Sequence, residues 1–142
     1  MTFDVSPYVL MTSQAEEART FYEDIFGAET RYIQRISDRP ESAKIGIEQD
    51  RLNRIDQAVL SLGNITLMLA DDTEGLPVTP GSHISLCLTF EMVEEARAIY
   101  DKLVSRGAEI LKPFTPEFYT EGYGFVRDPF GVSFHLFTKR IE

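Results

Sequence analysis

The sequence has one cysteine, two histidines and no long apolar run. A lone cysteine, Cys87, cannot form an internal disulfide, and without paired cysteines there is no cysteine-based zinc site. No stretch approaches the ~18 apolar residues of a membrane span. Residues 1–11 also lack the basic start and apolar segment of a secretory signal. We therefore expect a cytoplasmic protein without a membrane partner.

Positive charge is also scarce. Fourteen Lys and Arg residues stand against 23 Asp and Glu residues, which gives a formal net charge of −9. Because the basic residues do not cluster, the chain repels phosphate backbones, and we expect no nucleic-acid partner. A glycine-rich phosphate loop, a Gly-x-Ser-x-Gly elbow and a helical His-Glu-x-x-His motif are missing as well. These absences argue against nucleotide hydrolysis and against the common serine and zinc hydrolases.

What the sequence does contain is an internal repeat. Glu-Glu-Ala-Arg begins at Glu16 and again at Glu94, an offset of 94 − 16 = 78. Gly-Ala-Glu begins at Gly27 and again at Gly107, an offset of 107 − 27 = 80. Repeats at a fixed spacing indicate a duplicated structural unit, and 142 residues suffice for one domain built from two such units.

The hydrophobic periodicity predicts the same order of elements in both halves, a strand, a helix and three further strands. The predicted strands of the first half cover 7–11, 30–36, 57–62 and 65–70, and those of the second half cover 84–89, 110–114, 124–127 and 132–138. The helices end at Gly27 and Gly107. We expect an α+β fold of two βαβββ modules, about 1–70 and 82–142, joined by a linker over 71–81 within a single domain, 1–142.

Three local predictions accompany this assignment. Ser13 is the expected N-cap of the first helix. The residues from Ser37 to Ile55 hold no clear element, although a short helix or strand would fit there. The aromatic stretch from Pro113 to Tyr123 reads as an irregular loop, which either covers a cavity as a lid or packs on the sheet as an anchor.

Several motifs resemble the vicinal-oxygen-chelate superfamily, in particular its PhnB-like branch, whose members are often labelled glyoxalase or bleomycin-resistance proteins. The motifs are Pro7-Tyr8, Phe26–Glu29, Leu67-Met68 before Asp71-Asp72, and Asp128–Val132. The last, Asp-Pro-Phe-Gly-Val with the aromatic Phe134 two residues later, is the most specific. The resemblance implies a curved mixed sheet around a cavity with the helices on its outer face, and commonly a homodimer.

The resemblance also implies where a metal would bind. Enzymes of this superfamily hold a divalent ion with residues on the first and last strands of each module, and the matching positions here are Pro7, Met68, His83 and His135. Proline offers no side-chain donor, and a thioether is a poor ligand for hard ions. We therefore expect no cofactor. A divalent metal on His83 and His135, with a third ligand not identified, stays open as the alternative.

A ligand cavity is predicted from the alternation of strand side chains, with Ile84, Leu86 and Leu88 turned toward the helices. The same parity, applied to the other strands together with the aromatic stretch, predicts these lining residues: Val9, Met11, Gln57, Met68, His83, Ser85, Cys87, Tyr119, Tyr123, Ser133 and His135. The lining is mildly polar and uncharged, which suits a small, mostly apolar molecule. An ordinary filled core would show the same pattern.

Three functions are compatible with these features. The first is a PhnB-like protein that binds a small organic molecule without a complete metal site, with or without transforming it. The second is a glyoxalase- or dioxygenase-type enzyme in which a divalent ion on His83 and His135 acts as a Lewis acid. The third is a bleomycin-type protein that sequesters a cationic antibiotic, which the net charge of −9 permits.

Overall fold

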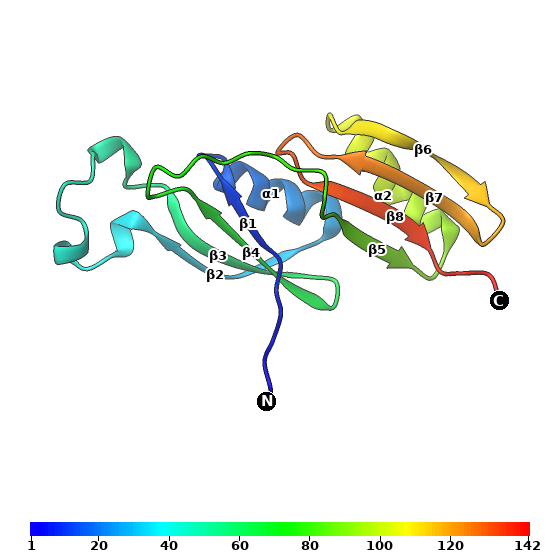
Figure 1. Ribbon diagram of the computed structural model, residues 1–142, viewed down its shortest axis with the longest axis horizontal. Coiled ribbons are helices and arrows are strands. Elements are labelled where there is room, and N and C mark those ends of the chain that lie inside the picture. The colour runs from blue at the N-terminus through cyan, green and yellow to red at the C-terminus, as the bar shows by residue number, and fades with distance from the viewer. The chain divides into compact units, whose positions relative to one another are not determined.

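A computed structural model describes all residues, 1–142, and divides the chain into two compact units (Figure 1). Unit 1 is Met1–Val78 and unit 2 is Thr79–Glu142. Each unit contains one helix and one four-stranded mixed sheet. Neither helix is long and apolar enough to cross a membrane.

Unit 1 begins with a short strand that becomes an edge of its sheet. Its elements are β1 (Tyr8–Met11), α1 (Ala15–Phe26), β2 (Glu29–Arg35), β3 (Ile55–Leu62) and β4 (Ile65–Asp71). The strand order is β1-β4-β3-β2, with β1 parallel to β4 and the other pairs antiparallel. Between β2 and β3 the chain makes three short 3-10 turns, η1 (Ile36–Asp38), η2 (Glu41–Ala43) and η3 (Gln49–Arg51).

Unit 2 repeats this topology. Its elements are β5 (Leu86–Phe90), α2 (Val93–Ser105), β6 (Glu109–Glu117), β7 (Thr120–Arg127) and β8 (Ser133–Thr138). The strand order is β5-β8-β7-β6, and β5 runs parallel to β8. The expected α+β fold of two tandem βαβββ modules is therefore confirmed.

The core of each unit lies between the helix and one face of the sheet. In unit 2, Tyr100 and Leu103 of α2 are buried with Phe134 and Leu136 of β8. In unit 1, Tyr22 and Ile25 of α1 are buried, as are the alternate β3 and β4 residues Ala58, Leu60, Leu62, Leu67 and Leu69. Burial of each large apolar side chain contributes about 1.5–3 kcal/mol.

The aromatic stretch of unit 2 is regular, so the prediction of an irregular loop over 113–123 is wrong. β6 and β7 form a hairpin that turns at Phe118 and Tyr119. Pro113 and Pro116 lie in β6, which is the edge strand of its sheet, where a missing N–H breaks no inner ladder. The prolines therefore signal an edge strand here rather than a loop.

The start of α1 is held by Asp71 and not by the predicted cap, Ser13. The N-cap position falls on Gln14, whose side chain makes no capping bond. Asp71, at the end of β4, is only 4% exposed. Its Oδ1 accepts the backbone N–H of Ala15 at 2.9 Å and its Oδ2 accepts that of Ile55 at 2.9 Å. One carboxylate thus joins the first residue of α1 to the first residue of β3.

Replacing Asp71 should destabilise unit 1. Asp71→Asn retains one acceptor oxygen, so we expect the free energy of unfolding to fall by about 1–3 kcal/mol. Asp71→Ala leaves two buried N–H groups without partners and should cost more. Urea unfolding measures both changes. Asp72→Ala is the matched control, because its carboxylate binds only exposed loop N–H groups. Equal losses for positions 71 and 72 would contradict this role.

Two glycines of β7 allow α2 and Phe114 to pack closely on the sheet. A Cβ atom at Gly124 would lie 2.8 Å from Cδ2 of Tyr100, and one at Gly122 would lie 2.8 Å from Cγ2 of Val93. Side chains at these positions would push the aromatic residues away from the sheet. Gly122 and Gly124 therefore allow close packing. This role agrees with the absence of a phosphate-loop motif from the sequence.

Gly124→Ala should lower the free energy of unfolding by about 1–3 kcal/mol, because the Tyr100 ring must move to admit the methyl group. Gly81→Ala is the control, since a Cβ there meets nothing within 4 Å. Thermal or urea unfolding of the two variants checks the difference. A neutral Gly124→Ala variant would show that the helix adjusts without cost.

Candidate functional site

Each sheet covers its helix with one face and leaves the other face without a helix, which we call the open face. In unit 2, α2 lies behind β7 and β8 in the view of Figure 1, so the open face is toward the viewer. Strand alternation places Ser133, His135 and Phe137 of β8 on this face, while Phe134 and Leu136 are fully buried in the core.

The open face of unit 2 has His135 at its centre. Cys87 of β5 and Phe125 of β7 are its register partners on the two neighbouring strands. The Phe125 ring stacks on the imidazole with centroids 3.9 Å apart and planes 2° from parallel. Stacking against a neighbouring strand holds the imidazole ring in one orientation.

Both ring nitrogens of His135 are hydrogen-bonded. Nδ1 lies 2.7 Å from the hydroxyl of Tyr123, and Nε2 lies 2.8 Å from the hydroxyl of Ser85. Burial raises the pKa of Tyr123 and lowers the pKa of His135. At neutral pH the phenol therefore stays protonated and the imidazole neutral, so one ring nitrogen of His135 donates and the other accepts in these two hydrogen bonds.

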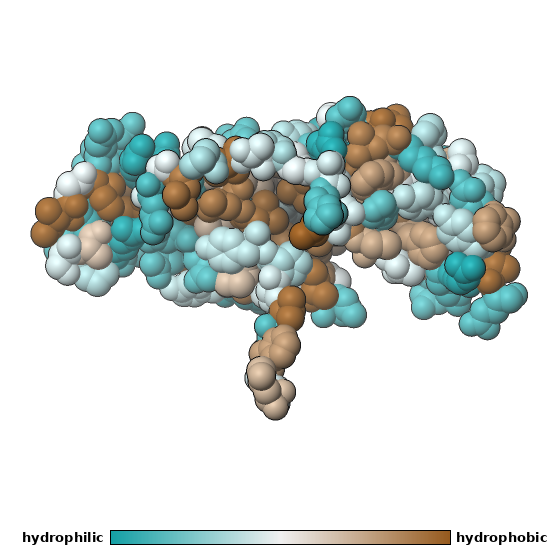
Figure 2. All heavy atoms as spheres, in the orientation of Figure 1, coloured by the Kyte–Doolittle hydropathy of each residue, from teal (hydrophilic) through white to brown (hydrophobic).

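Aromatic rings surround this polar group. Tyr119 stacks on Phe137 with centroids 6.0 Å apart, and Tyr123 meets Phe137 edge to face at 6.1 Å. Lys112 and Glu117 pair with each other at 3.0 Å, and the Arg140 guanidinium lies over the Tyr119 ring at 5.4 Å from its centroid. Figure 2 shows a mixture of apolar and polar surface over this part of unit 2. Such a surface can hold a small apolar molecule and offers it a few hydrogen bonds.

The structure brings together most of the residues predicted for the second module. Ser85, Cys87, Tyr123 and His135 meet on the open face, and Tyr119 joins them from the turn of the hairpin. Ser133 lies on the same side of β8, but its hydroxyl is buried and has no hydrogen-bond partner. Phe125 and Phe137 were missed, although both alternate in sequence with core residues and could have been found by that signal.

His83 does not join this group. It is exposed and precedes β5, whose first residue is Leu86, so the prediction of a strand beginning at 84 is wrong. Ile84, predicted to face the helix, is 81% exposed. The place beside the His135 ring belongs to Ser85 instead.

In unit 1 two of the four predicted lining residues, Gln57 and Met68, lie on the open face. Met68 pairs with Val59 of β3, and Gln57 lies on the same face as Val59. Val9 and Met11, however, pair with Leu69 and Asp71, so they point toward α1. Their expected place on the open face is wrong, because a register shift of one residue moves every side chain to the other face. Tyr8 and Leu10 take that place.

The donor atoms present do not fit a divalent ion. Pro7 offers only its backbone oxygen, which already accepts the N–H of Met68 at 3.0 Å. His135 would have to give up a hydrogen bond to bind a metal, since Tyr123 and Ser85 occupy its two ring nitrogens. No group of three or more His, Cys, Asp or Glu side chains has a metal-binding arrangement. A divalent ion on His83 and His135 therefore stays an alternative prediction that lacks a third ligand.

Comparison with known proteins identifies the family. Residues 5–136 match the Glyoxalase/Bleomycin resistance protein/Dioxygenase superfamily. The chain belongs to this superfamily, which confirms the resemblance to vicinal-oxygen-chelate proteins.

Among individual proteins, the chain is 27% identical to protein YjdN of Escherichia coli K12 over 136 residues, 90% of each chain. Protein PA1353 from Pseudomonas aeruginosa shares the fold with a TM-score of 0.83 at 23% identity, covering 97% of this chain and 98% of that one. The PhnB protein from Bacillus cereus, a putative 3-demethylubiquinone-9 3-methyltransferase, follows with a TM-score of 0.75 at 24% identity over 96% and 99%.

The fosfomycin resistance protein FosX from Listeria monocytogenes also shares the fold, with a TM-score of 0.67 at 12% identity over 97% and 93% of the two chains. A variant of that protein has been solved with Mn(II) and 1S,2S-dihydroxypropylphosphonic acid. At these identities the solved structures establish the fold of this chain and not its ligand.

The environment of His135 predicts a pH dependence of stability. Its pKa in the folded chain lies below the ordinary value of 6.5, so the unfolded chain binds more protons between the two values. The free energy of unfolding should then fall as the pH drops below about 6.5 and through the folded pKa. Urea unfolding at about pH 7.5 and about pH 5.5 should show this loss, and His135→Gln should reduce it. A histidine NMR titration with its midpoint above 6.5 would contradict the assignment.

Proposed function

We propose that this protein binds a small, uncharged and largely apolar organic molecule on the open face of unit 2, without a complete metal site. The observation that carries the proposal is the position of the His135 imidazole, which is held between Tyr123 and Ser85 and stacked on Phe125. The PhnB-like protein among the structural neighbours agrees with this branch of the superfamily.

The hydrogen bonds of His135 favour a ligand with one polar group. A polar group of the ligand, such as a hydroxyl, can take the place of the Ser85 hydroxyl and form the hydrogen bond to Nε2. The rings of Phe125 and Phe137 would contact the apolar part of the ligand. A charged ligand would find Lys112 already paired with Glu117 and the Arg140 guanidinium already stacked over the Tyr119 ring.

The same residues also suit proton transfer. A neutral imidazole can take up a proton, and the Tyr123 phenol can donate one, because burial keeps it protonated at neutral pH. Binding and acid–base chemistry therefore use one set of groups. The homodimer, the single domain 1–142 and the contribution of Gln57 and Met68 to the lining stay predictions.

Cys87 provides a direct test of binding, because it is the sole thiol and is exposed beside His135. A library of small uncharged fragments is screened for those that raise the melting temperature and slow the alkylation of Cys87 by iodoacetamide. We expect such fragments to bind His135→Ala and Tyr123→Phe about two- to tenfold more weakly, since a neutral hydrogen bond contributes about 0.5–1.5 kcal/mol.

Lys102→Ala is the matched control for these variants, because Lys102 is an exposed residue of α2, on the other side of the sheet. It should leave the affinity and the alkylation rate unchanged. Fragments that leave the alkylation rate of Cys87 unchanged, and that bind His135→Ala as tightly as the wild type, would bind elsewhere. That result would overturn the proposal.

A further inference from the structure

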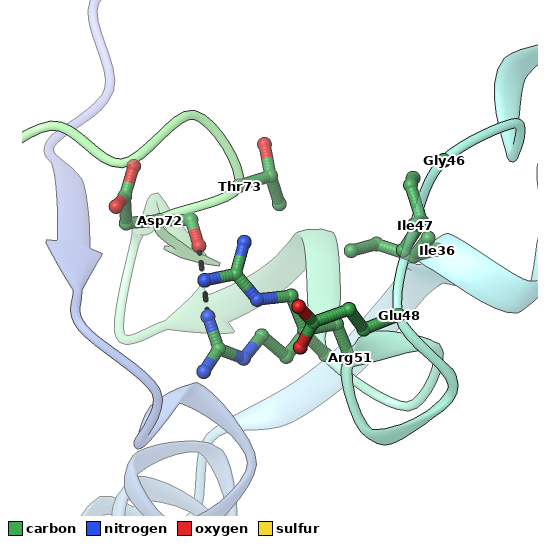
Figure 3. A pocket seen from close by; sticks show the side chains of 8 residues that line it. Ile36, Gly46, Ile47, Glu48, Arg51, Asp72 and Thr73 are labelled. Atoms are coloured by element: carbon green, nitrogen blue, oxygen red, sulfur yellow. Dashed lines mark hydrogen bonds between the residues drawn. The ribbon is translucent and has the colours of Figure 1, made fainter.

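Unit 1 contains a hollow of about 270 Å³ at the end of its sheet (Figure 3). The hollow is bounded by Ile36 after β2, by the loop around Gly46 and Ile47, and by Thr73 after β4. Its volume is slightly below that of typical drug-sized sites, so it suits a small metabolite or ion and not a nucleotide. None of its residues belongs to the site around His135.

Two arginines line this hollow, and neither has a carboxylate partner. Arg35 and Arg39 of the same segment pair with Glu16 at 2.9 Å and with Asp56 at 2.5 Å. Arg51 and Arg54 make no such pair, and Arg54 reaches only the backbone oxygen of Asp72, at 3.5 Å. The hollow thus holds two guanidinium groups without a carboxylate partner in a chain with 23 acidic and 14 basic side chains.

The acidic residues of the hollow form no ion pair with these arginines. The Oδ1 atom of Asp72 accepts the N–H groups of Glu74 at 3.1 Å and Leu76 at 3.2 Å, which directs the carboxylate into its own loop. Figure 3 shows the Asp72 carboxylate turned away from the guanidinium groups. Glu48 also lines the hollow but is exposed and forms no ion pair. Two positive groups therefore face at most one free carboxylate.

We propose that Arg51 and Arg54 bind the oxyanion of a small metabolite, a carboxylate or phosphate group. Guanidinium groups present paired N–H donors whose spacing matches the oxygens of both anions. Ile36, which is buried, and Ile47 form an apolar wall for the remainder of the ligand. Thr73 adds a hydroxyl group to the lining.

Isothermal titration calorimetry of the full chain with inorganic phosphate and with butyrate tests this site. We expect at least one anion to bind with a Kd of about 1 mM or lower. The double variant Arg51→Gln, Arg54→Gln should weaken binding at least about tenfold. Arg51→Gln alone, at an exposed position where folding is not at risk, should weaken it in the same direction. Binding of phosphate alone or of butyrate alone identifies the anion.

Arg31→Gln is the matched control, because it removes the same charge from an exposed residue of β2 that pairs with Glu29. It should leave the Kd unchanged, and so should His135→Gln, which separates this site from the one in unit 2. If neither anion binds at about 20 mM, or if Arg31→Gln weakens binding as much as Arg51→Gln, the proposal is wrong.

Discussion

The parallel pairing of the first and last strands of each module is the constraint on which the rest of the structure depends. It places β1 beside β4 and β5 beside β8, so residues far apart in sequence share a row of the sheet. In unit 2 this row brings Cys87 to His135 and the Ser85 hydroxyl to the imidazole. Without this pairing, the polar group of the open face would not exist.

The two modules share this topology but fix the start of the helix in different ways. In unit 1, Asp71 is the register partner of Met11 and bonds the N–H groups that begin α1 and β3. In unit 2 the corresponding partner of Phe90 is Thr138, whose buried Oγ1 bonds nothing. There Glu95 accepts the N–H of Met92 and closes the first turn of α2. The two modules thus share the sheet topology but not the contact that fixes the start of the helix.

Much of this fold could be predicted from the sequence, because the repeat and the hydrophobic periodicity are properties of the chain itself. The predictions are wrong where a shift of one residue in strand register changes the face on which a side chain lies. The sequence predicts Val9 and Met11 on the open face and not on the helix side, because only the pairing with Leu69 and Asp71 determines which way they point. Long-range contacts of this kind leave no local signal.

The site around His135 was partly predictable for the same reason. Alternation on one strand places His135 on the open face, but its bonds to Tyr123 and Ser85 come from two other strands or their flanks. The prediction of an irregular loop over 113–123 depends on its prolines, which an edge strand tolerates. The arginine hollow was not predicted, because Arg51 and Arg54 carry no motif and only the fold brings them near Thr73.

The central claim is that His135 is held by hydrogen bonds and takes part in binding an organic ligand and not a metal, in a superfamily where metal-binding members occur. The most direct test is elemental analysis of tagless protein after incubation with Zn²⁺, Ni²⁺ or Mn²⁺ and desalting, beside the double variant His83→Ala, His135→Ala. The account predicts no stoichiometric metal in either protein. Near-stoichiometric metal in the wild type that disappears in the variant would contradict it.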